Sequence, residues 1–226
     1  VSDLKKITKN TAAVILETIQ GGAGFIVPKN GYLKKVKQRC EEVGALLIVD
    51  EIQTGIGRTG KFWGFEHFEI IPDIIISGKG LGGGMPIGAF IAQKNLMDVL
   101  KEHPTLGHIT TFGGHPVIAS AGVATVNTIQ NSTLIEDTLE KEQLIRSLLK
   151  HPLIKEIRGK GLMLAVLVES PEIAAKIIHR CLANGLILFF LLFEGRAIRI
   201  TPPLTISKKE ISKGCKILLE TLDELS

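Results

Sequence analysis

Short apolar runs alternate with helically patterned segments along the first half of the sequence. The segment that starts at Tyr32 repeats its apolar residues at helical spacing, and Gly44 follows where a helix end accepts positive φ. This alternation predicts an α/β layered fold. The runs expected to form strands lie at residues 12–16, 45–49, 74–76 and 86–92.

The pattern changes near residue 130, after a predicted helix of small residues. Thr133 and Glu136 have the spacing of a capping box, which predicts the start of a charged helix. We therefore expect two domains joined by a helix. Part of a large domain is placed at residues 1–130, the linking helix at 131–151 and a small C-terminal α/β domain at 152–226.

A strand and helix pattern continues to the C-terminus. Ser207 and Glu210 form a second capping box, which predicts the start of the last helix. The longest apolar run, at residues 186–193, is expected to be a buried strand. Further strands are predicted at 162–168 and 197–200, and a further helix at 171–184.

Polar residues end three successive predicted strands: Glu17, the pair Asp50 and Glu51, and Lys79. Each of them could simply mark where a strand emerges into water. In open α/β sheets, however, ligands bind at the carboxyl ends of the strands, and glycines lie beside two of these ends. The pattern therefore favours one shared site.

Lys79 lies between glycines directly after a predicted buried strand. Its backbone can approach a ligand closely, and a partly desolvated amine is nucleophilic toward a carbonyl, as a Schiff-base lysine must be. Asp50 is a carboxylate of the kind that keeps a pyridinium nitrogen protonated, and Gln53 could donate to an oxygen on the same ring. Taken singly, these residues could equally be a loop lysine, a turn aspartate and an exposed amide.

Four sequence blocks give these residues a context. They are VDEIQTG at 49–55, GRTG at 57–60, PD at 72–73 with SGKGLGGG at 77–84, and TTFGGHP at 110–116. Together they resemble the class III aminotransferases of the ornithine, acetylornithine and γ-aminobutyrate type, which are pyridoxal-phosphate-dependent transferases of fold type I.

The resemblance implies a role for each matching residue. Lys79 would carry pyridoxal 5'-phosphate as a Schiff base, with Asp50 on the pyridine nitrogen and Gln53 on the ring hydroxyl. Thr111 would bind the phosphate of the neighbouring subunit, so that a homodimer shares its active sites. Arg199 would bind the substrate carboxylate.

The resemblance also implies an enzyme that transfers an amino group from a donor to a 2-oxo acid. The donor is expected to be an ω-amine such as acetylornithine, ornithine or γ-aminobutyrate. Glu17 would pair with Arg199 when an ω-amine is bound and release it to a dicarboxylate. The chain departs from the family at Thr18, where the family has proline, and at Gly22, where an acidic residue is common.

Only the second half of the family's length is matched, so we expect this chain to be a part of the enzyme with an incomplete large domain. The alternative is a non-catalytic folded remnant or partner module that binds little or no cofactor. A dinucleotide site is a weaker alternative: residues 78–83 fit GxGxxG, but a strand rather than a helix follows them.

Composition and charge bear on which partners, membrane contacts and metal or disulfide sites are expected. The net charge of +4 is spread along the chain, and the basic run at 34–39 lies in a helical pattern, so no nucleic-acid partner is expected. No apolar run approaches the roughly 20 residues that cross a bilayer, so no membrane association is expected. Three cysteines without a CxxC pair suggest neither a disulfide framework nor a metal site, which fits a cytoplasmic protein.

Overall fold

Two sheets organise the chain, each in its own unit. The computed structural model describes residues 2–29, 31–105 and 107–225, with the side chains of residues 2 and 3 left out. Both units are discontinuous along the sequence. The first comprises Val1–Thr18, Pro28–Ile56 and Trp63–Ser132, and the second comprises Ile19–Val27, Gly57–Phe62 and Thr133–Ser226.

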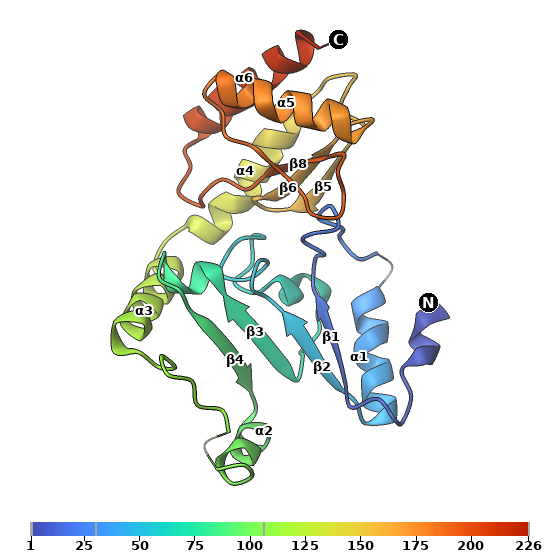
Figure 1. Ribbon diagram of the computed structural model, residues 1–226, viewed down its shortest axis with the longest axis vertical. Coiled ribbons are helices and arrows are strands. Elements are labelled where there is room, and N and C mark those ends of the chain that lie inside the picture. Colours follow the sequence, from blue (N-terminus) through green and yellow to red (C-terminus); the bar gives the residue numbers. More distant parts are fainter. Residues whose placement is uncertain (1, 30, 106, 226) are drawn as a thin grey trace. The chain divides into compact units, whose positions relative to one another are not determined.

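The first unit contains a four-stranded sheet in the order β1-β2-β3-β4 (Figure 1). The first three strands are parallel and β4 is antiparallel to β3. Strands β1 and β2 are the predicted apolar runs, and β3 extends beyond its predicted end as far as Gly78. The strands are β1 (Ala13–Glu17), β2 (Leu46–Asp50), β3 (Ile74–Gly78) and β4 (Gly88–Ala92).

Helix α1 supplies the core of this unit. Its residues Leu33, Val36 and Cys40 pack against Leu47 and Val49 of β2. The predicted end of this helix is confirmed, because its C-cap, Gly44, has φ 80°. The helical elements of the unit are α1 (Tyr32–Val43), α2 (Lys94–Asp98) and α3 (Pro116–Gln130), with 3-10 turns η1 (Ser2–Lys6), η2 (Gly64–Phe68), η3 (Lys79–Gly82) and η4 (Val99–Lys101).

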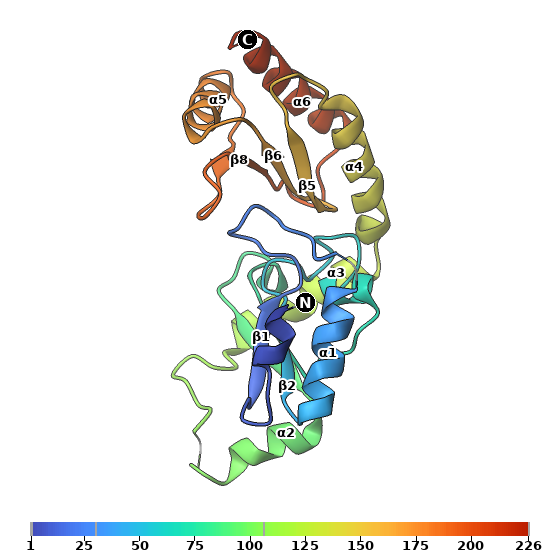
Figure 2. The same ribbon diagram turned by 90° about the vertical axis from the view of Figure 1, so that its right-hand side faces the viewer.

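The second unit contains an antiparallel sheet in the order β5-β6-β8-β7. Figure 2 shows its three helices gathered beside the sheet. Residues Leu164 and Val166 of β6 share a core with Ile177 of α5 and Leu218 of α6. The elements are α4 (Leu134–Leu148), β5 (Glu156–Lys160), β6 (Met163–Leu167), α5 (Pro171–Ala183), β7 (Phe189–Phe190), β8 (Ala197–Ile200) and α6 (Lys208–Asp223).

Two predictions about this unit are wrong. The run at 186–193 is not a buried strand: only Phe189–Phe190 pairs, at the edge of the sheet, and the side chains of both residues are exposed. Thr133 is the N-cap of α4, but its hydroxyl donates to the Asp137 carboxylate at 3.1 Å and not to a capping-box partner. The capping box of Ser207 and Glu210 is confirmed.

Strand β5 was not predicted. Its charged residues Glu156, Arg158 and Lys160 alternate with Ile157 and Gly159, so that it lacks an apolar run. Gly159 has φ 102°, and a Cβ there would lie 1.9 Å from the Met163 carbonyl oxygen. The glycine thus allows the close approach of β5 to β6.

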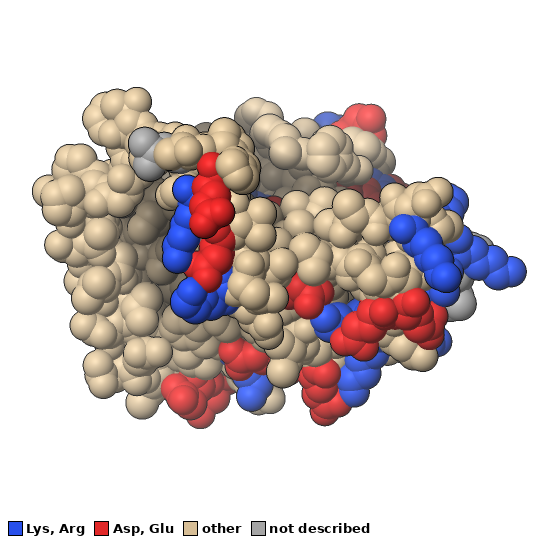
Figure 3. Space-filling model, turned by 90° about the horizontal axis from the view of Figure 1, so that it is seen from below, with Lys and Arg blue, Asp and Glu red and all other residues tan. Residues whose placement is uncertain are grey.

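Charges are mixed on the face shown in Figure 3, where basic side chains lie beside acidic ones. Within the first unit, Lys94 pairs with Asp98, and Lys101 approaches the same carboxylate at 2.5 Å. No helix among the described residues is long and apolar enough to cross a membrane. The three cysteines are free thiols, and the described part of the chain holds no cluster of three or more potential metal ligands.

Candidate active site

The carboxyl ends of the parallel strands bring Glu17 and Asp50 together. Glu17 is the last residue of β1 and is the direct partner of Asp50, the last residue of β2. Asp50 in turn lies opposite Ile76 of β3, and that strand ends just before Lys79. The expected convergence of these strand ends at one edge of the sheet is therefore observed.

Lys79 begins η3 with an exposed side chain and a left-handed backbone, φ 42°. A residue other than glycine rarely takes this conformation, and strained backbone is concentrated at functional sites. The preceding Gly78 has close neighbours: a Cβ there would lie 3.1 Å from the Ile87 carbonyl oxygen. Among the described residues, the buried Ser77 hydroxyl has no hydrogen-bond partner.

Asp50 and Gln53 lie on either side of a turn that follows β2, and both are half-buried. One carboxylate oxygen of Asp50, Oδ1, accepts a hydrogen bond from the Ile52 backbone at 2.9 Å. The hydrogen bond fixes the orientation of the carboxylate relative to the turn. A carboxylate and an amide therefore lie close in sequence at the same sheet edge.

Glu51 accepts hydrogen bonds from a neighbouring backbone segment, a role that the sequence did not reveal. Its side chain is fully buried, and its carboxylate accepts hydrogen bonds from the backbone of Gly64 and Phe65, each at 2.8 Å. The Thr54 hydroxyl donates to the same carboxylate at 2.6 Å. Burial raises the pKa of Glu51, while these hydrogen bonds lower it. The one available sequence signal was its position on the opposite face of the strand end from Asp50.

Thr111 lies in an exposed turn that precedes α3. The turn is closed by the Gly113 backbone, which donates to the Thr110 carbonyl at 3.1 Å. The structure places the Thr111 side chain at a surface of the first unit. Its expected contact with a cofactor phosphate in a neighbouring subunit stays a prediction.

Arg199 belongs to the second unit, where it is half-buried on β8. Its Nε donates to the Thr201 hydroxyl at 2.9 Å. Arg58 lies nearby and donates to the carbonyls of Leu162 at 3.1 Å and Pro202 at 2.6 Å. Burial, and then the charge of Arg199, lower the pKa of Arg58 to about 10. The second unit therefore contains two neighbouring guanidinium groups.

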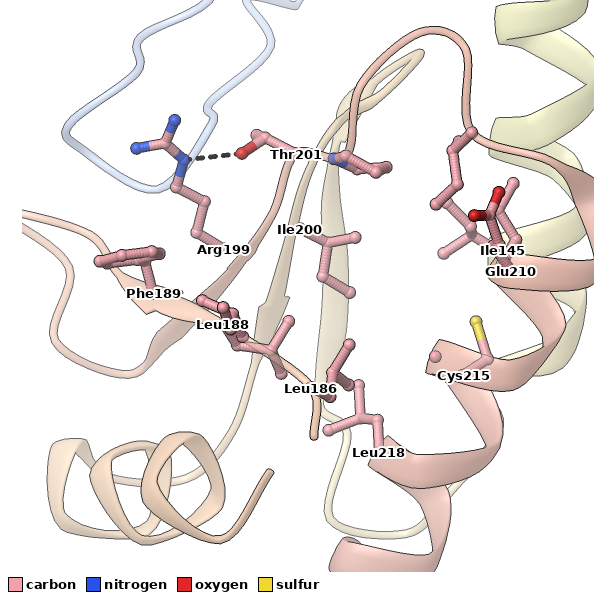
Figure 4. A pocket seen from close by; sticks show the side chains of 15 residues that line it. Ile145, Leu186, Leu188, Phe189, Arg199, Ile200, Thr201, Glu210, Cys215 and Leu218 are labelled. Carbon is pink, nitrogen blue, oxygen red and sulfur yellow. Dashed lines mark hydrogen bonds between the residues drawn. The ribbon is translucent and has the colours of Figure 1, made fainter. Parts of the chain in front are cut away.

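A pocket of about 380 Å³ lies in the second unit (Figure 4). Leu186, Ile200, Cys215 and Leu218 contribute to its mostly apolar lining. Figure 4 shows the Arg199 guanidinium directed away from these apolar side chains, because successive residues of a strand point to opposite faces. The polar end of Arg199 is thus separated from the apolar part of the pocket.

Comparisons with known proteins identify the family. The family described as Aminotransferase class-III matches residues 1–222. A putrescine aminotransferase from Pectobacterium atrosepticum is 41% identical over 233 aligned positions, which cover 100% of this chain and 50% of that protein. An acetylornithine aminotransferase from Caldanaerobacter subterraneus is 38% identical, covering 97% of this chain and 55% of that protein.

Solved structures agree with these relatives. Acetylornithine aminotransferase from Elizabethkingia anophelis has a TM-score of 0.90 at 38% identity, covering 99% of this chain and 57% of that one. Ornithine aminotransferase from Toxoplasma gondii, which has partial occupancy of pyridoxal phosphate at its active site, has a TM-score of 0.89 at 35% identity, covering 99% of this chain and 53% of that one.

The chain spans about half the length of the curated relatives that it matches. Over that span, the family match, the level of identity and the fold all indicate an aminotransferase. The chain belongs to the class III aminotransferases, a family of pyridoxal-phosphate-dependent enzymes.

Proposed function

We propose that this chain supplies cofactor-binding and substrate-binding residues for transamination between a primary amine and a 2-oxo acid. The observation that carries the proposal is the alignment of Glu17 and Asp50 at the ends of adjacent parallel strands, next to the loop that opens with Lys79. The membership of the chain in the class III family supports the same reaction.

The polar residues at this sheet edge fit pyridoxal phosphate by their chemistry. Lys79 offers an amine to the aldehyde, and Asp50 offers a carboxylate to the ring nitrogen. Gln53 offers an amide donor to the ring oxygen. When bound, the cofactor supplies an electron-withdrawing ring that stabilises negative charge on the carbon that bears the amino group.

Asp50 and Lys79 have different roles in the proposed reaction. Asp50 holds a proton on the ring nitrogen, which maintains the positive charge of the ring. The Lys79 amine holds the cofactor in the resting enzyme and, once free, moves a proton to and from the substrate carbon. Its flexible stem suits an amine that must occupy both positions.

The donor is proposed to be an ω-amine such as acetylornithine, ornithine or γ-aminobutyrate. Two relatives are named putrescine aminotransferase and acetylornithine aminotransferase. These names support an ω-amine as donor but do not indicate which one this protein uses. Arg199 is proposed to bind a substrate carboxylate through its planar guanidinium group. Thr111 is proposed to bind the cofactor phosphate of a partner subunit in a homodimer. The protein is also proposed to be cytoplasmic.

The control of Arg199 by Glu17 is a separate part of the proposal. A carboxylate from the protein and one from the substrate compete for the same guanidinium group, so Glu17→Gln should improve the use of glutamate relative to an ω-amine. The measurement is the ratio of the two kcat/KM values in the whole enzyme. An unchanged ratio would show that Glu17 has no part in selecting the substrate.

The test of the main proposal is cofactor binding by the chain itself. Addition of pyridoxal phosphate to the wild-type chain should produce an absorbance band near the visible edge, and borohydride reduction should attach the cofactor covalently. Lys79→Ala should abolish both signals. Lys61→Ala, which removes another exposed lysine, should leave both unchanged.

A wild-type chain without this band would favour the second candidate, a folded module that binds no cofactor. Exposed apolar residues on both outer strands of the first sheet are the observation that favours that candidate. Ile15 of β1 is 62% exposed and Phe90 of β4 is 48% exposed, which suits a surface made to pair with further polypeptide.

A further inference from the structure

Glu51 lies where the ends of three strands of the first unit meet. It directly follows β2, and its backbone N–H donates to the Ile76 carbonyl of β3 at 2.8 Å. Its carboxylate accepts from Thr54, and the Thr54 hydroxyl accepts from Thr18 at 2.9 Å. Thr18 directly follows β1. Glu51 therefore continues directly from the end of β2, and hydrogen bonds connect it with the end of β3 and, through Thr54, with the residue that follows β1.

The hydroxyl groups in this connection have a defined direction. Thr18 donates to Thr54, and Thr54 donates to a Glu51 carboxylate, which has no proton to return. Successive hydrogen bonds in a buried chain strengthen one another. The three side chains are at most 1% exposed, so they are shielded from water.

Two glycines lie close to this network and to the backbone of Glu51. A Cβ at Gly64 would lie 2.7 Å from the Thr18 hydroxyl oxygen and 3.0 Å from a Glu51 carboxylate oxygen. A Cβ at Gly55 would lie 2.8 Å from the Glu51 carbonyl oxygen. Glycines thus enclose the network closely, and a buried charge without its donors would be costly.

We propose that Glu51 is a positioning residue for the candidate active site and that Thr18 is the link by which it also fixes the end of β1. Asp50 directly precedes Glu51, Gln53 follows it two residues later, and Glu17 directly precedes Thr18. Holding Glu51 and Thr18 in place therefore fixes the backbone from which the three candidate side chains project.

The Thr18 link requires a hydroxyl at this position, because the Thr18 side chain donates to the Thr54 hydroxyl. In this chain, the orientation of the turn after β2 depends on the residue that follows Glu17.

The first test measures the network without any cofactor. Amide hydrogen exchange at Gly64 and Phe65 reports directly on their hydrogen bonds to Glu51. Thr18→Val should accelerate this exchange about fivefold, the effect of losing one typical hydrogen bond, whereas Thr18→Ser, which keeps the hydroxyl, should stay close to wild type. Glu51→Gln should accelerate exchange by about tenfold or more, since an amide cannot accept at both ends.

Thr138→Val is the matched control. Thr138 is fully buried like Thr18, but its hydroxyl donates to the Leu134 carbonyl within α4 of the second unit. This variant should leave exchange at Gly64 and Phe65 unchanged. Equal exchange rates in Thr18→Val and wild type would overturn the proposed link, whatever the behaviour of Glu51→Gln.

The second test concerns the site and rests on the proposed function. In the chain loaded with pyridoxal phosphate, Thr18→Val and Glu51→Gln should shift the pH midpoint of the cofactor absorbance change by about half a unit or more, because Asp50 is displaced. Thr18→Ser and Thr138→Val should not. Altered exchange with an unmoved midpoint would limit the network to a structural role.

A wild-type chain without a cofactor band would contradict the proposed function. The exchange rates of Gly64 and Phe65 would still show whether Thr18 and Glu51 hold this part of the backbone in place.

Discussion

The buried Glu51 and the half-buried Arg58 are both held by hydrogen bonds to backbone groups. The Glu51 carboxylate accepts backbone N–H groups from Gly64 and Phe65. The Arg58 guanidinium donates to the carbonyls of Leu162 and Pro202. A charged group bound in this way holds distant backbone segments in a fixed geometry, because each hydrogen bond left unmade in the interior is expensive.

Glu51 should make the stability of the protein depend on pH. Burial raises its pKa above the ordinary value of 4.5, so the folded state binds more protons than the unfolded state between 4.5 and the folded pKa. The contribution of Glu51 is therefore fully present below this window and is lost as pH rises through it.

The free energy of unfolding of wild type and Glu51→Gln, measured in urea between pH 4 and 7, checks this sign. The advantage of wild type over the variant should decrease as pH rises from about 4 and then become constant. An advantage that grows over the same interval would mean that hydrogen bonds outweigh burial in setting the pKa of Glu51.

Arg58 should matter for stability more than its charge alone suggests. Arg58→Leu removes both donors and leaves the Leu162 and Pro202 carbonyls unsatisfied, which should lower the free energy of unfolding by about 1–3 kcal/mol. Arg180→Leu is the control: it removes an exposed ion pair with Glu224 and should cost less than about 1 kcal/mol. Urea denaturation of both variants measures the difference.

Sequence patterning located the candidate site residues, but it did not locate the residues that hold them in place. Glu17, Asp50 and Lys79 were expected at strand ends because polar residues interrupt apolar runs there. The part played by Glu51 depends on Gly64, Phe65 and Thr18, whose proximity arises only when the chain folds. Contacts of this kind leave no periodic signal in the sequence.

At the scale of elements, continuous apolar runs in the centre of a sheet were the easiest strands to predict. Strand β6 is such a run, lies between β5 and β8 and is buried at every position, and β2, between two parallel neighbours, is buried at Leu47 and Val49. The same criterion failed for residues 186–193, which are equally apolar but lie at a sheet edge with Phe189, Phe190 and Phe193 exposed. Hydrophobicity alone does not distinguish a buried strand from an exposed apolar edge.

The two predicted capping boxes differ in the structure and should differ in energy. The Ser207 hydroxyl accepts from the Glu210 backbone at 3.2 Å, and a Glu210 carboxylate oxygen accepts from the Ser207 backbone at 2.8 Å. Thr133 makes no such cap bond. Ser207→Ala should therefore cost about 1 kcal/mol, and Thr133→Ala clearly less.

Urea denaturation of the two alanine variants measures this difference. The comparison is matched, since each variant removes one hydroxyl at the N-cap of a helix in the second unit. Equal losses of stability would show that the hydrogen bond of Thr133 to Asp137 is worth as much as a capping box.

At the scale of the whole molecule, each unit has its own hydrophobic core and its own buried thiols. Cys40 lies in the core of the first unit, and Cys181 and Cys215 lie in the core of the second. Burial raises the pKa of all three thiols, that of Cys215 to about 11. Because the thiolate is the reactive form, native thiols should react slowly, and each should report the opening of its own unit.

Core substitutions should therefore expose the thiols unit by unit. Leu218→Ala and Leu47→Ala each remove a large side chain that is at most 1% exposed, at a cost of about 2–5 kcal/mol. If each core stabilises its own unit, Leu218→Ala should accelerate alkylation of Cys181 and Cys215, and Leu47→Ala that of Cys40. Mass spectrometry of peptides after a short alkylation pulse assigns the rates. Equal acceleration of all three thiols by either variant would instead mean that the chain opens as one cooperative body, because local opening exposes only the residues of the region that unfolds.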